Sequence, residues 1–201
     1  MTRMTIDPGR DALVVVDLQN DFCPGGALGV RGGDAIVPVV NRYLERFAAA
    51  GAPVFLTRDW HPSVTRHFKA FGGVWPPHCV QGTRGAEFHP DLAPPAGAVI
   101  VSKGMDPDQD AYSAFQAQDR SARPFPAVLA ERGVQRLYVG GLATDYCVRA
   151  TVVDALRGGF EVVVLGDAIA AVDLEPGDGG RAIDEMQGAG ARLTSLIELG
   201  I

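Results

Sequence analysis

Short apolar runs rich in β-branched residues alternate along the chain with longer amphipathic stretches. The apolar runs predict strands at Ala12–Asp17, Pro53–Asp59, Ala98–Lys103, Arg136–Gly140, Glu161–Leu165 and Ala191–Ser195. The amphipathic stretches predict helices at Gly33–Ala50, Pro124–Arg132, Thr144–Arg157 and Gly179–Gln187. Such alternation is typical of βα units. We therefore expect a three-layer α/β/α fold with a central, mostly parallel, six-stranded sheet.

Helix-terminating residues support these boundaries. Gly51, Gly133 and Gly158 each follow a helical run, where a C-terminal cap is expected. Thr144 and Asp145 stand where an N-cap belongs for the helix that follows the fourth strand.

The stretch from Trp60 to Gly97 lacks any clean periodicity and is rich in Pro, Gly, His and aromatic residues. A loop of this length inside a compact domain usually carries function. Because no internal repeat or linker composition marks a boundary, we expect residues 1–201 to form one domain.

Composition narrows the possible partners. The chain has 201 residues, 47% of them hydrophobic, and a formal net charge of -6 without a cluster of basic residues. This balance argues against nucleic acid as a partner. The N-terminus lacks an apolar signal core, and the apolar runs are too short to cross a bilayer, so a cytoplasmic location without membrane insertion is expected. In a reducing compartment, the three cysteines should be free thiols.

Several reactive side chains come at or just after predicted strand ends. Asp17, Asp59 and Lys103 end three strands, and the segment 141–147, which contains Cys147, follows a fourth. In a doubly wound parallel sheet, ligands bind beyond the carboxyl ends of the strands. Two carboxylates, an amine and a thiol should therefore face one crevice.

Cys147 opens a helical run, where free N–H groups and the helix dipole lower a thiol's pKa and can hold an oxyanion. Asp17 ends an apolar strand, so burial should raise its pKa unless a cation such as Lys103 lies nearby. A buried core cysteine and a simple Asp–Lys ion pair are the plainer interpretations of these residues. Together, however, they make a base, an orienting cation and a nucleophile. Cys23 and Cys79 are interpreted as packing residues.

Three of the four histidines lie between residues 61 and 78. Asp59 and His61 are two residues apart, so their side chains share one face of an extended segment. With His67 and His78, they offer one carboxylate and three imidazoles, a set that suits Zn, Fe, Mn or Co. His89 stands apart and is interpreted as structural or exposed.

The residues around these groups resemble the nicotinamidase/pyrazinamidase branch of the isochorismatase-like cysteine hydrolases. The matching segments, in the family's order, are Asp17–Leu28 (DLQNDFCPGGAL), Thr57–Pro62 (TRDWHP), Trp75–Gln81 (WPPHCVQ), Lys103–Phe115 (KGMDPDQDAYSAF) and Gly141–Val148 (GLATDYCV). Each motif alone is weak, but five in order are specific.

The resemblance implies a role for each matching residue. Asp17, Lys103 and Cys147 would be the catalytic triad. The metal ligands would be Asp59, His61, His67 and His78, holding one divalent transition metal (Zn, Fe or Mn). The walls of the substrate pocket would be Phe22, Trp75 and Tyr112. A cis peptide bond between Leu142 and Ala143 would place the N–H groups of Ala143 and Cys147 as the oxyanion hole.

The implied reaction is hydrolysis of nicotinamide, and also of pyrazinamide, in cytoplasmic NAD salvage. The resemblance leaves homo-oligomerisation open. One alternative is a related amidohydrolase acting on a carbamoyl or ureido group, but it has no use for the Asp-His-His-His cluster. Isochorismatases cleave a vinyl ether without a thiol nucleophile, so the presence of Cys147 argues against that branch of the family. A non-catalytic metal-binding module would explain the histidines but not the residues at the strand ends.

Overall fold

The computed structural model describes residues 5–199 as a six-stranded parallel sheet covered by helices. The strands are β1 (Asp11–Val16), β2 (Val54–Asp59), β3 (Val99–Lys103), β4 (Arg136–Leu142), β5 (Glu161–Ala170) and β6 (Arg192–Thr194). The α-helices are α1 (Val37–Ala49), α2 (Phe125–Glu131), α3 (Arg149–Arg157), α4 (Asp178–Gly188) and α5 (Leu196–Leu199). The sheet order is β3-β2-β1-β4-β5-β6, with every pair parallel. The predicted fold class is confirmed.

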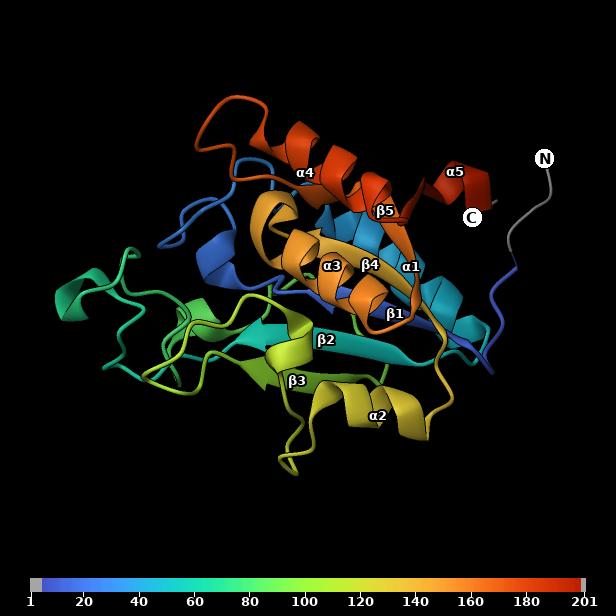
Figure 1. Cartoon of the computed structure of the whole chain (residues 1–201), viewed down its shortest axis with the longest axis horizontal. Coiled ribbons are helices and arrows are strands. Elements are labelled where there is room, and N and C mark those ends of the chain that lie inside the picture. Colours follow the sequence, from blue (N-terminus) through green and yellow to red (C-terminus); the bar gives the residue numbers. More distant parts are fainter. Residues whose placement is uncertain (1–4, 200–201) are drawn as a thin grey trace.

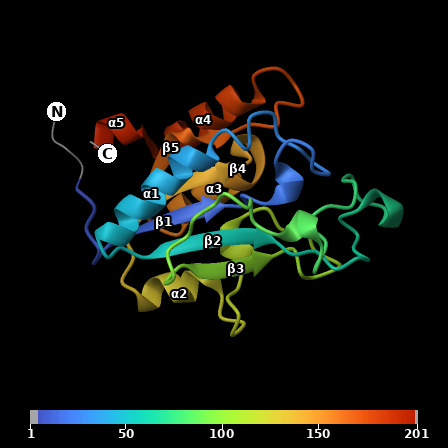
Figure 2. The same ribbon diagram turned by 180° about the vertical axis from the view of Figure 1, so that it is seen from behind.

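The alternation of side chains along the strands divides the core into two layers. In β1, Leu13 and Val15 pack with α1 and α5, whereas Ala12, Val14 and Val16 pack with α2, α3 and α4. Figures 1 and 2 show these two groups of helices on opposite faces of the sheet. Because both faces of the sheet are covered, its central strands are continuous apolar runs, as the sequence pattern indicated.

The chain order reverses between β1 and β4, which makes this pair the switch point of the sheet. A crevice opens at such a point, beyond the carboxyl ends of the strands. The register places Val16 opposite Gly141 and Asp59 opposite Lys103. The carboxyl ends of β1 to β4 therefore lie within about two residues of one another.

The structure corrects some predicted boundaries. β5 continues to Ala170, five residues beyond the predicted end, because a register shift against β4 lets it resume pairing. The helix predicted from Thr144 begins as a π-helical turn, in which Val148 N–H donates to the Ala143 carbonyl (3.0 Å). Neither Thr144 nor Asp145 is the N-cap, a position taken by Ala143.

The predicted C-terminal caps are confirmed at three helices. Gly51 and Gly133 directly follow the C-cap residues of α1 and α2 and have positive φ values of 72° and 67°. Gly158 is itself the C-cap residue of α3, and the left-handed residue there is the next one, Gly159 (φ 85°).

The irregular segment between β2 and β3 extends from the carboxyl end of the sheet, seen at the left of Figure 1. It contains two short 3-10 turns, Lys69–Phe71 and Arg84–Ala86. Among residues 5–199, none of the helices has the length and apolarity needed to span a bilayer.

Candidate active site and metal centre

Lys103, at the end of β3, joins the reactive groups that end the neighbouring strands. Its Nζ lies 2.7 Å from Asp17 Oδ2, donates to Asp59 Oδ1, and reaches Cys147 Sγ at 3.5 Å. All four residues are buried. Thr57 Oγ1 donates to Asp17 Oδ1 (2.6 Å) and so fixes the orientation of that carboxyl group. The structure thus brings together the two carboxylates, the amine and the thiol that were predicted to meet at the strand ends.

Electrostatics in this cluster favour a neutral thiol beside a charged amine. Burial raises the pKa of Asp17, although the Lys103 ammonium opposes the shift. Burial alone would lower the pKa of Lys103, but Asp17 and Asp59 hold it well above its usual value. Burial raises the pKa of Cys147 well above its ordinary value, so the prediction that a helix start lowers it is wrong. Such a thiol needs a base, and a carboxyl group with a raised pKa is suited to that task.

The three clustered histidines converge on one point. Each donates Nδ1–H to an oxygen acceptor: His61 to Gly104 O (3.0 Å), His67 to Asp110 Oδ1 (2.5 Å) and His78 to Pro76 O (2.8 Å). Since these acceptors cannot donate, each Nδ1 carries the proton and Nε2 keeps its lone pair in the neutral ring. One nitrogen from each ring lies within 4.8 Å of the others. Acceptors behind the rings fix metal ligands in this way.

Asp59 connects the histidines to the cluster formed by Asp17, Lys103 and Cys147. Its Oδ1 accepts from Lys103, while its Oδ2 lies 3.5 Å from His61 Nε2 and 3.9 Å from His78 Nε2. Burial would raise the pKa of Asp59, but Lys103 and His61 lower it, which keeps the carboxylate charged. Burial also lowers the pKa of His67, and that of His78 to about 4, so these rings are neutral near pH 7.

These residues fit a divalent metal. His61 Nε2 is buried and, within the described part of the chain, makes no hydrogen bond. Leaving a buried polar atom unpaired is costly unless a ligand takes its lone pair. Three imidazole nitrogens and one carboxylate oxygen make a donor set that divalent transition metals accept.

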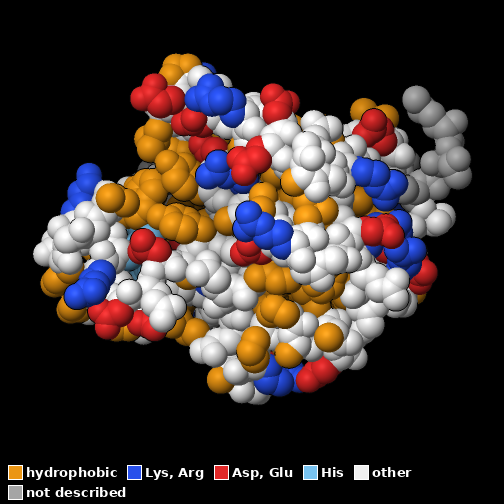
Figure 3. Space-filling model, in the orientation of Figure 1, with side chains coloured by type: hydrophobic (Ala, Val, Ile, Leu, Met, Phe, Trp, Pro, Cys, Tyr) orange, Lys and Arg blue, Asp and Glu red, His pale blue; other side chains and the backbone are white. Residues whose placement is uncertain are grey.

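A cavity of about 310 Å³ lies over both clusters. Asp59, His67 and His78 border one end of this cavity, and Cys147 also borders the cavity. Its walls are mainly apolar and aromatic: Phe22, Trp75, Tyr112, Tyr146, Val172 and Leu174. Figure 3 shows the hollow, rimmed by hydrophobic side chains with histidine visible inside it. Its volume is near the lower end of the roughly 300–1,000 Å³ range of small-molecule sites, which suits a small aromatic ligand.

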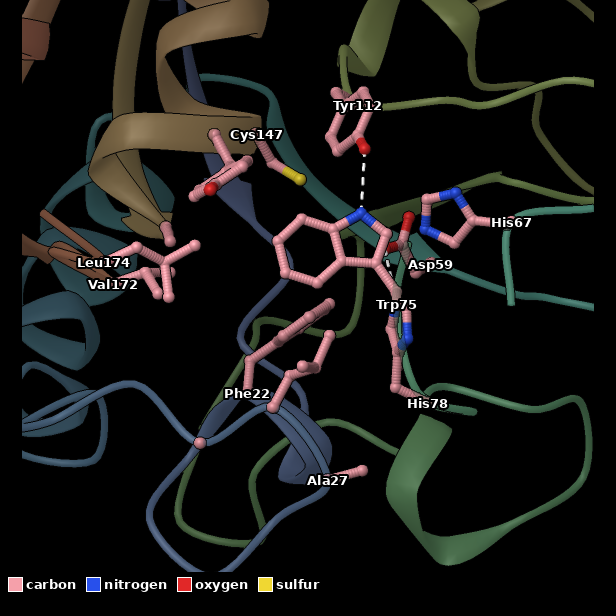
Figure 4. Close-up of a pocket in the computed structure, with 14 residues that line it drawn as sticks. Phe22, Ala27, Asp59, His67, Trp75, His78, Tyr112, Cys147, Val172 and Leu174 are labelled. Carbon is pink, nitrogen blue, oxygen red and sulfur yellow. Dashed lines mark hydrogen bonds and ion pairs between the residues drawn. The ribbon is translucent and has the colours of Figure 1, made fainter. Parts of the chain in front are cut away.

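The predicted pocket residues Phe22, Trp75 and Tyr112 all line this cavity. Trp75 Nε1–H donates to Tyr112 Oη (2.9 Å), so these two rings are held together (Figure 4). Tyr146, which contacts the Trp75 ring edge-on at a centroid distance of 5.3 Å, was not predicted.

The predicted oxyanion residues, Ala143 and Cys147, both border the cavity. The peptide bond between Leu142 and Ala143 is cis, as the resemblance implied. Just before it, Gly141 has φ 116°, and a Cβ there would lie 2.1 Å from the Val16 carbonyl oxygen. Only glycine therefore fits where β4 passes the end of β1.

The three residues whose oxygens orient the histidines, Gly104, Asp110 and Pro76, were not predicted. Asp110 lies in an acidic stretch that is mostly exposed, and the sequence holds no signal linking it to His67. Gly104 accepts from His61 and has φ 69°, and a Cβ on it would come within 2.5 Å of the His61 ring. A glycine directly after a strand-end lysine was the only available clue. His89, partly exposed, lies outside the cluster, and Cys23 and Cys79 are buried free thiols.

Comparison with known proteins agrees with this geometry. The family model described as the isochorismatase domain matches residues 11–198. The nicotinamidase of Escherichia coli (strain K12) is 41% identical over 203 residues, covering 93% of this chain and 95% of that protein. The nicotinamidase/pyrazinamidase of Mycobacterium tuberculosis is 41% identical over 185 residues, covering 90% of this chain and 97% of that protein.

Among solved structures, the pyrazinamidase of Pyrococcus horikoshii in complex with zinc is similar, with a TM-score of 0.86 and 46% identity. The match covers 92% of this chain and 99% of that one. Sequence, fold and site geometry lead to the same conclusion: the chain belongs to the isochorismatase family of hydrolases.

Proposed function

We propose that this chain is a metal-dependent cysteine amidohydrolase that converts nicotinamide to nicotinate and ammonia, with pyrazinamide as a second substrate. The observation that carries the proposal is that a thiol, a carboxyl group and an ammonium meet next to three convergent imidazole nitrogens, beside a cavity bordered by the thiol and by two of the imidazoles. Relatives named nicotinamidase and pyrazinamidase, at 41–46% identity, support this substrate class.

Binding would use the two ends of the cavity. The pyridine ring would lie against Phe22 and Trp75, which gives the apolar and aromatic contact that such a ring requires. Held by Asp59 and the three histidines, a divalent transition metal (Zn, Fe or Mn) would supply an open coordination position for the ring nitrogen. A zinc complex of a similar pyrazinamidase supports zinc among these metals.

The chemistry would begin at Cys147. Asp17 accepts the thiol proton, and the sulfur bonds to the carboxamide carbon to give a tetrahedral oxyanion. The N–H groups of Ala143 and Cys147 would donate to that oxyanion, and each such donor is typically worth about 10²–10³ in rate. The C–N bond then breaks as Asp17 returns its proton to the nitrogen, releasing ammonia and leaving a nicotinoyl thioester on Cys147.

Hydrolysis of the thioester would use the same carboxylate. Asp17 takes a proton from water as the water oxygen attacks the acyl carbon. The C–S bond breaks, Asp17 returns its proton to the sulfur, and the product acid gives up its proton to solvent and departs as nicotinate. Lys103 would keep Asp17 oriented and ionised through both half-reactions, because its ammonium lies 2.7 Å from that carboxyl group. A carbamoyl or ureido substrate is not favoured, since it would leave the three convergent imidazoles without a role.

The remaining features of the proposal follow from this chemistry. A free thiol nucleophile suits a reducing cytoplasm, where NAD salvage would use the product nicotinate. Residues 1–201 would act as a single domain, since the two clusters come from strand ends of one sheet and the loop after β2.

The test is ammonia release from nicotinamide by purified protein, before and after chelation of metal. We expect release that chelation removes and that metal restores. Cys147→Ala should release no ammonia while binding metal with the wild-type stoichiometry. Substantial turnover by Cys147→Ala would overturn the thiol mechanism, and no release from metal-loaded wild type would overturn the substrate assignment.

A further inference from the structure

The segment between β5 and α4 forms the wall of the cavity that lies away from the metal-binding end. Val172 and Leu174 come from this segment and border the cavity. Figure 4 shows both on the side of Cys147 opposite to His67 and Asp59. The Leu174 side chain is 64% exposed, so packing beneath it does little to hold this wall in place.

Asp145 is the side chain that attaches this wall to the helix carrying the nucleophile. Its Oδ1 accepts the Val172 N–H and its Oδ2 accepts the Asp173 N–H, both at 2.9 Å. Asp145 is 5% exposed, lies two residues before Cys147, and is not among the residues that line the cavity. Its carboxylate therefore acts on the substrate site through these two backbone groups of the wall.

The backbone at the attachment point is bent, and it is anchored on its other side. Asp173 has φ 51°, a left-handed conformation that is uncommon outside glycine. The Asp173 carboxylate accepts Gly179 N–H (2.8 Å) in the first turn of α4. A Cβ on Gly179 would lie 2.5 Å from the Ala171 Cβ, so α4 packs closely against the segment. With both anchors in place, residues 172–174 have a defined position relative to Cys147.

We propose that Asp145 is a positioning residue that holds residues 172–174 as the substrate-binding wall, and that it thereby sets KM more than the rate of the chemical step. This inference rests on the proposed amidase function. It distinguishes Asp145 from Asp17 and Lys103, whose loss should lower kcat, because Asp145 touches the wall and not the reacting groups.

Asp145→Asn is the sharpest perturbation. The amide keeps one acceptor oxygen but turns an NH₂ donor toward a backbone N–H, so one of the two bonds is replaced by a donor–donor contact. Hydrogen bonds to charged groups are the strong ones, and losing one here should raise KM about tenfold. The kcat for nicotinamide should stay within about threefold, since the triad contacts are unchanged.

Asp119→Asn is a control for the loss of a loop carboxylate away from the cavity. Asp119 also accepts two backbone N–H groups, from Ser121 (2.8 Å) and Arg123 (3.0 Å), both through Oδ1, while its Oδ2 accepts from Arg123 Nε (2.8 Å), and its loop does not border the cavity. Amide hydrogen exchange gives a second readout that needs no substrate. The Val172 and Asp173 amides should lose protection in Asp145→Asn and keep it in Asp119→Asn.

A double-mutant cycle with Leu174→Ala tests the route of the effect. If Asp145 acts through the wall, the two substitutions together should raise KM by less than the product of their separate effects. A fall in kcat with KM unchanged, independent effects in the cycle, or retained protection at Val172 and Asp173 would overturn the inference. Should Asp145→Asn fail to fold, Asp145→Glu moves the same two acceptors by one methylene and is read in the same way.

Failure of the inference and failure of the proposed function are distinguishable. If wild-type protein released no ammonia, the function would fail while the exchange experiment still tested the attachment. If wild-type protein were active and Asp145→Asn kept the wild-type KM, only the inference would fail.

Discussion

Replacing Lys103 with methionine should separate the catalytic use of its charge from its contribution to stability. The substitution keeps the length of the side chain but removes the ammonium that lies between Asp17 and Asp59. Removing one partner of a buried ion pair typically costs about 3–5 kcal/mol, because the remaining charge stays buried. Here two buried carboxyl groups lose their shared cation, so we expect a loss of at least this size in the free energy of unfolding.

The catalytic loss has a separate cause. Burial already raises the pKa of Asp17 against the opposing effect of Lys103, and without the ammonium it should rise further. A protonated Asp17 cannot take the thiol proton of Cys147. General-base catalysis is typically worth about 10²–10⁴ in rate, so kcat should fall by that factor. The lost rate should partly return as pH rises, because Asp17 is then ionised again.

Arg136→Met is the control for stability. Arg136 binds Asp11 through Nε (2.8 Å) and Nη2 (2.6 Å), and Asp11 is fully buried. This pair lies where β1 and β4 begin, at the opposite end of the sheet from the site. The Arg136→Met substitution should lower the free energy of unfolding by about as much as Lys103→Met does, but it should leave kcat within about twofold of the wild-type value.

Urea unfolding gives the stability of each variant, and ammonia release under conditions where each is folded gives kcat. A Lys103→Met variant that is destabilised but keeps its kcat would refute the role assigned to this ammonium. An Arg136→Met variant that loses as much activity as Lys103→Met would also refute that role.

Two further predictions concern the metal centre. Asp110→Asn should weaken zinc binding by about 10–100-fold in a competition with a chromophoric chelator, because the carboxylate orients His67; Asp108→Asn, on the same segment, should not. Unchanged affinity in Asp110→Asn would contradict this orientation. In metal-free protein, His78 has a pKa of about 4 when folded and about 6.5 when unfolded, so the unfolded chain binds more protons between these values. The contribution of His78 to the free energy of unfolding should thus be about 2 kcal/mol smaller at pH 5 than at pH 7.5. His78→Gln should reduce the pH dependence seen in urea unfolding by about that amount and leave the part due to His67, whose pKa is also lowered. Equal pH dependence in both proteins would refute it.

Much of the site was predictable because it lies at strand ends. Asp17, Asp59 and Lys103 each end an apolar run, and parallel strands bring such ends to one edge of the sheet. The sequence could not supply the register that places Asp59 opposite Lys103, since the register depends on tertiary packing. It also could not reveal that Asp110 supports His67, because that contact joins two irregular loops.

Two local predictions were wrong because tertiary contacts prevailed over local preferences. Asp145 has the chemistry of an N-cap, but its carboxylate is used by Val172 and Asp173. Cys147 lies at a helix start, yet its burial outweighs the effect of the helix dipole on the thiol pKa. Both outcomes depend on segments distant in sequence, which local patterns do not report.

The central claim is that Cys147 becomes acylated during turnover, and rapid-quench mass spectrometry tests it most directly. Metal-loaded protein would be mixed with nicotinamide, quenched in acid within one turnover, and digested. We predict a nicotinoyl group on the peptide that contains Cys147, formed along with the first equivalent of ammonia. Ammonia release with no adduct on this peptide, together with an active Cys147→Ala variant, would contradict the account.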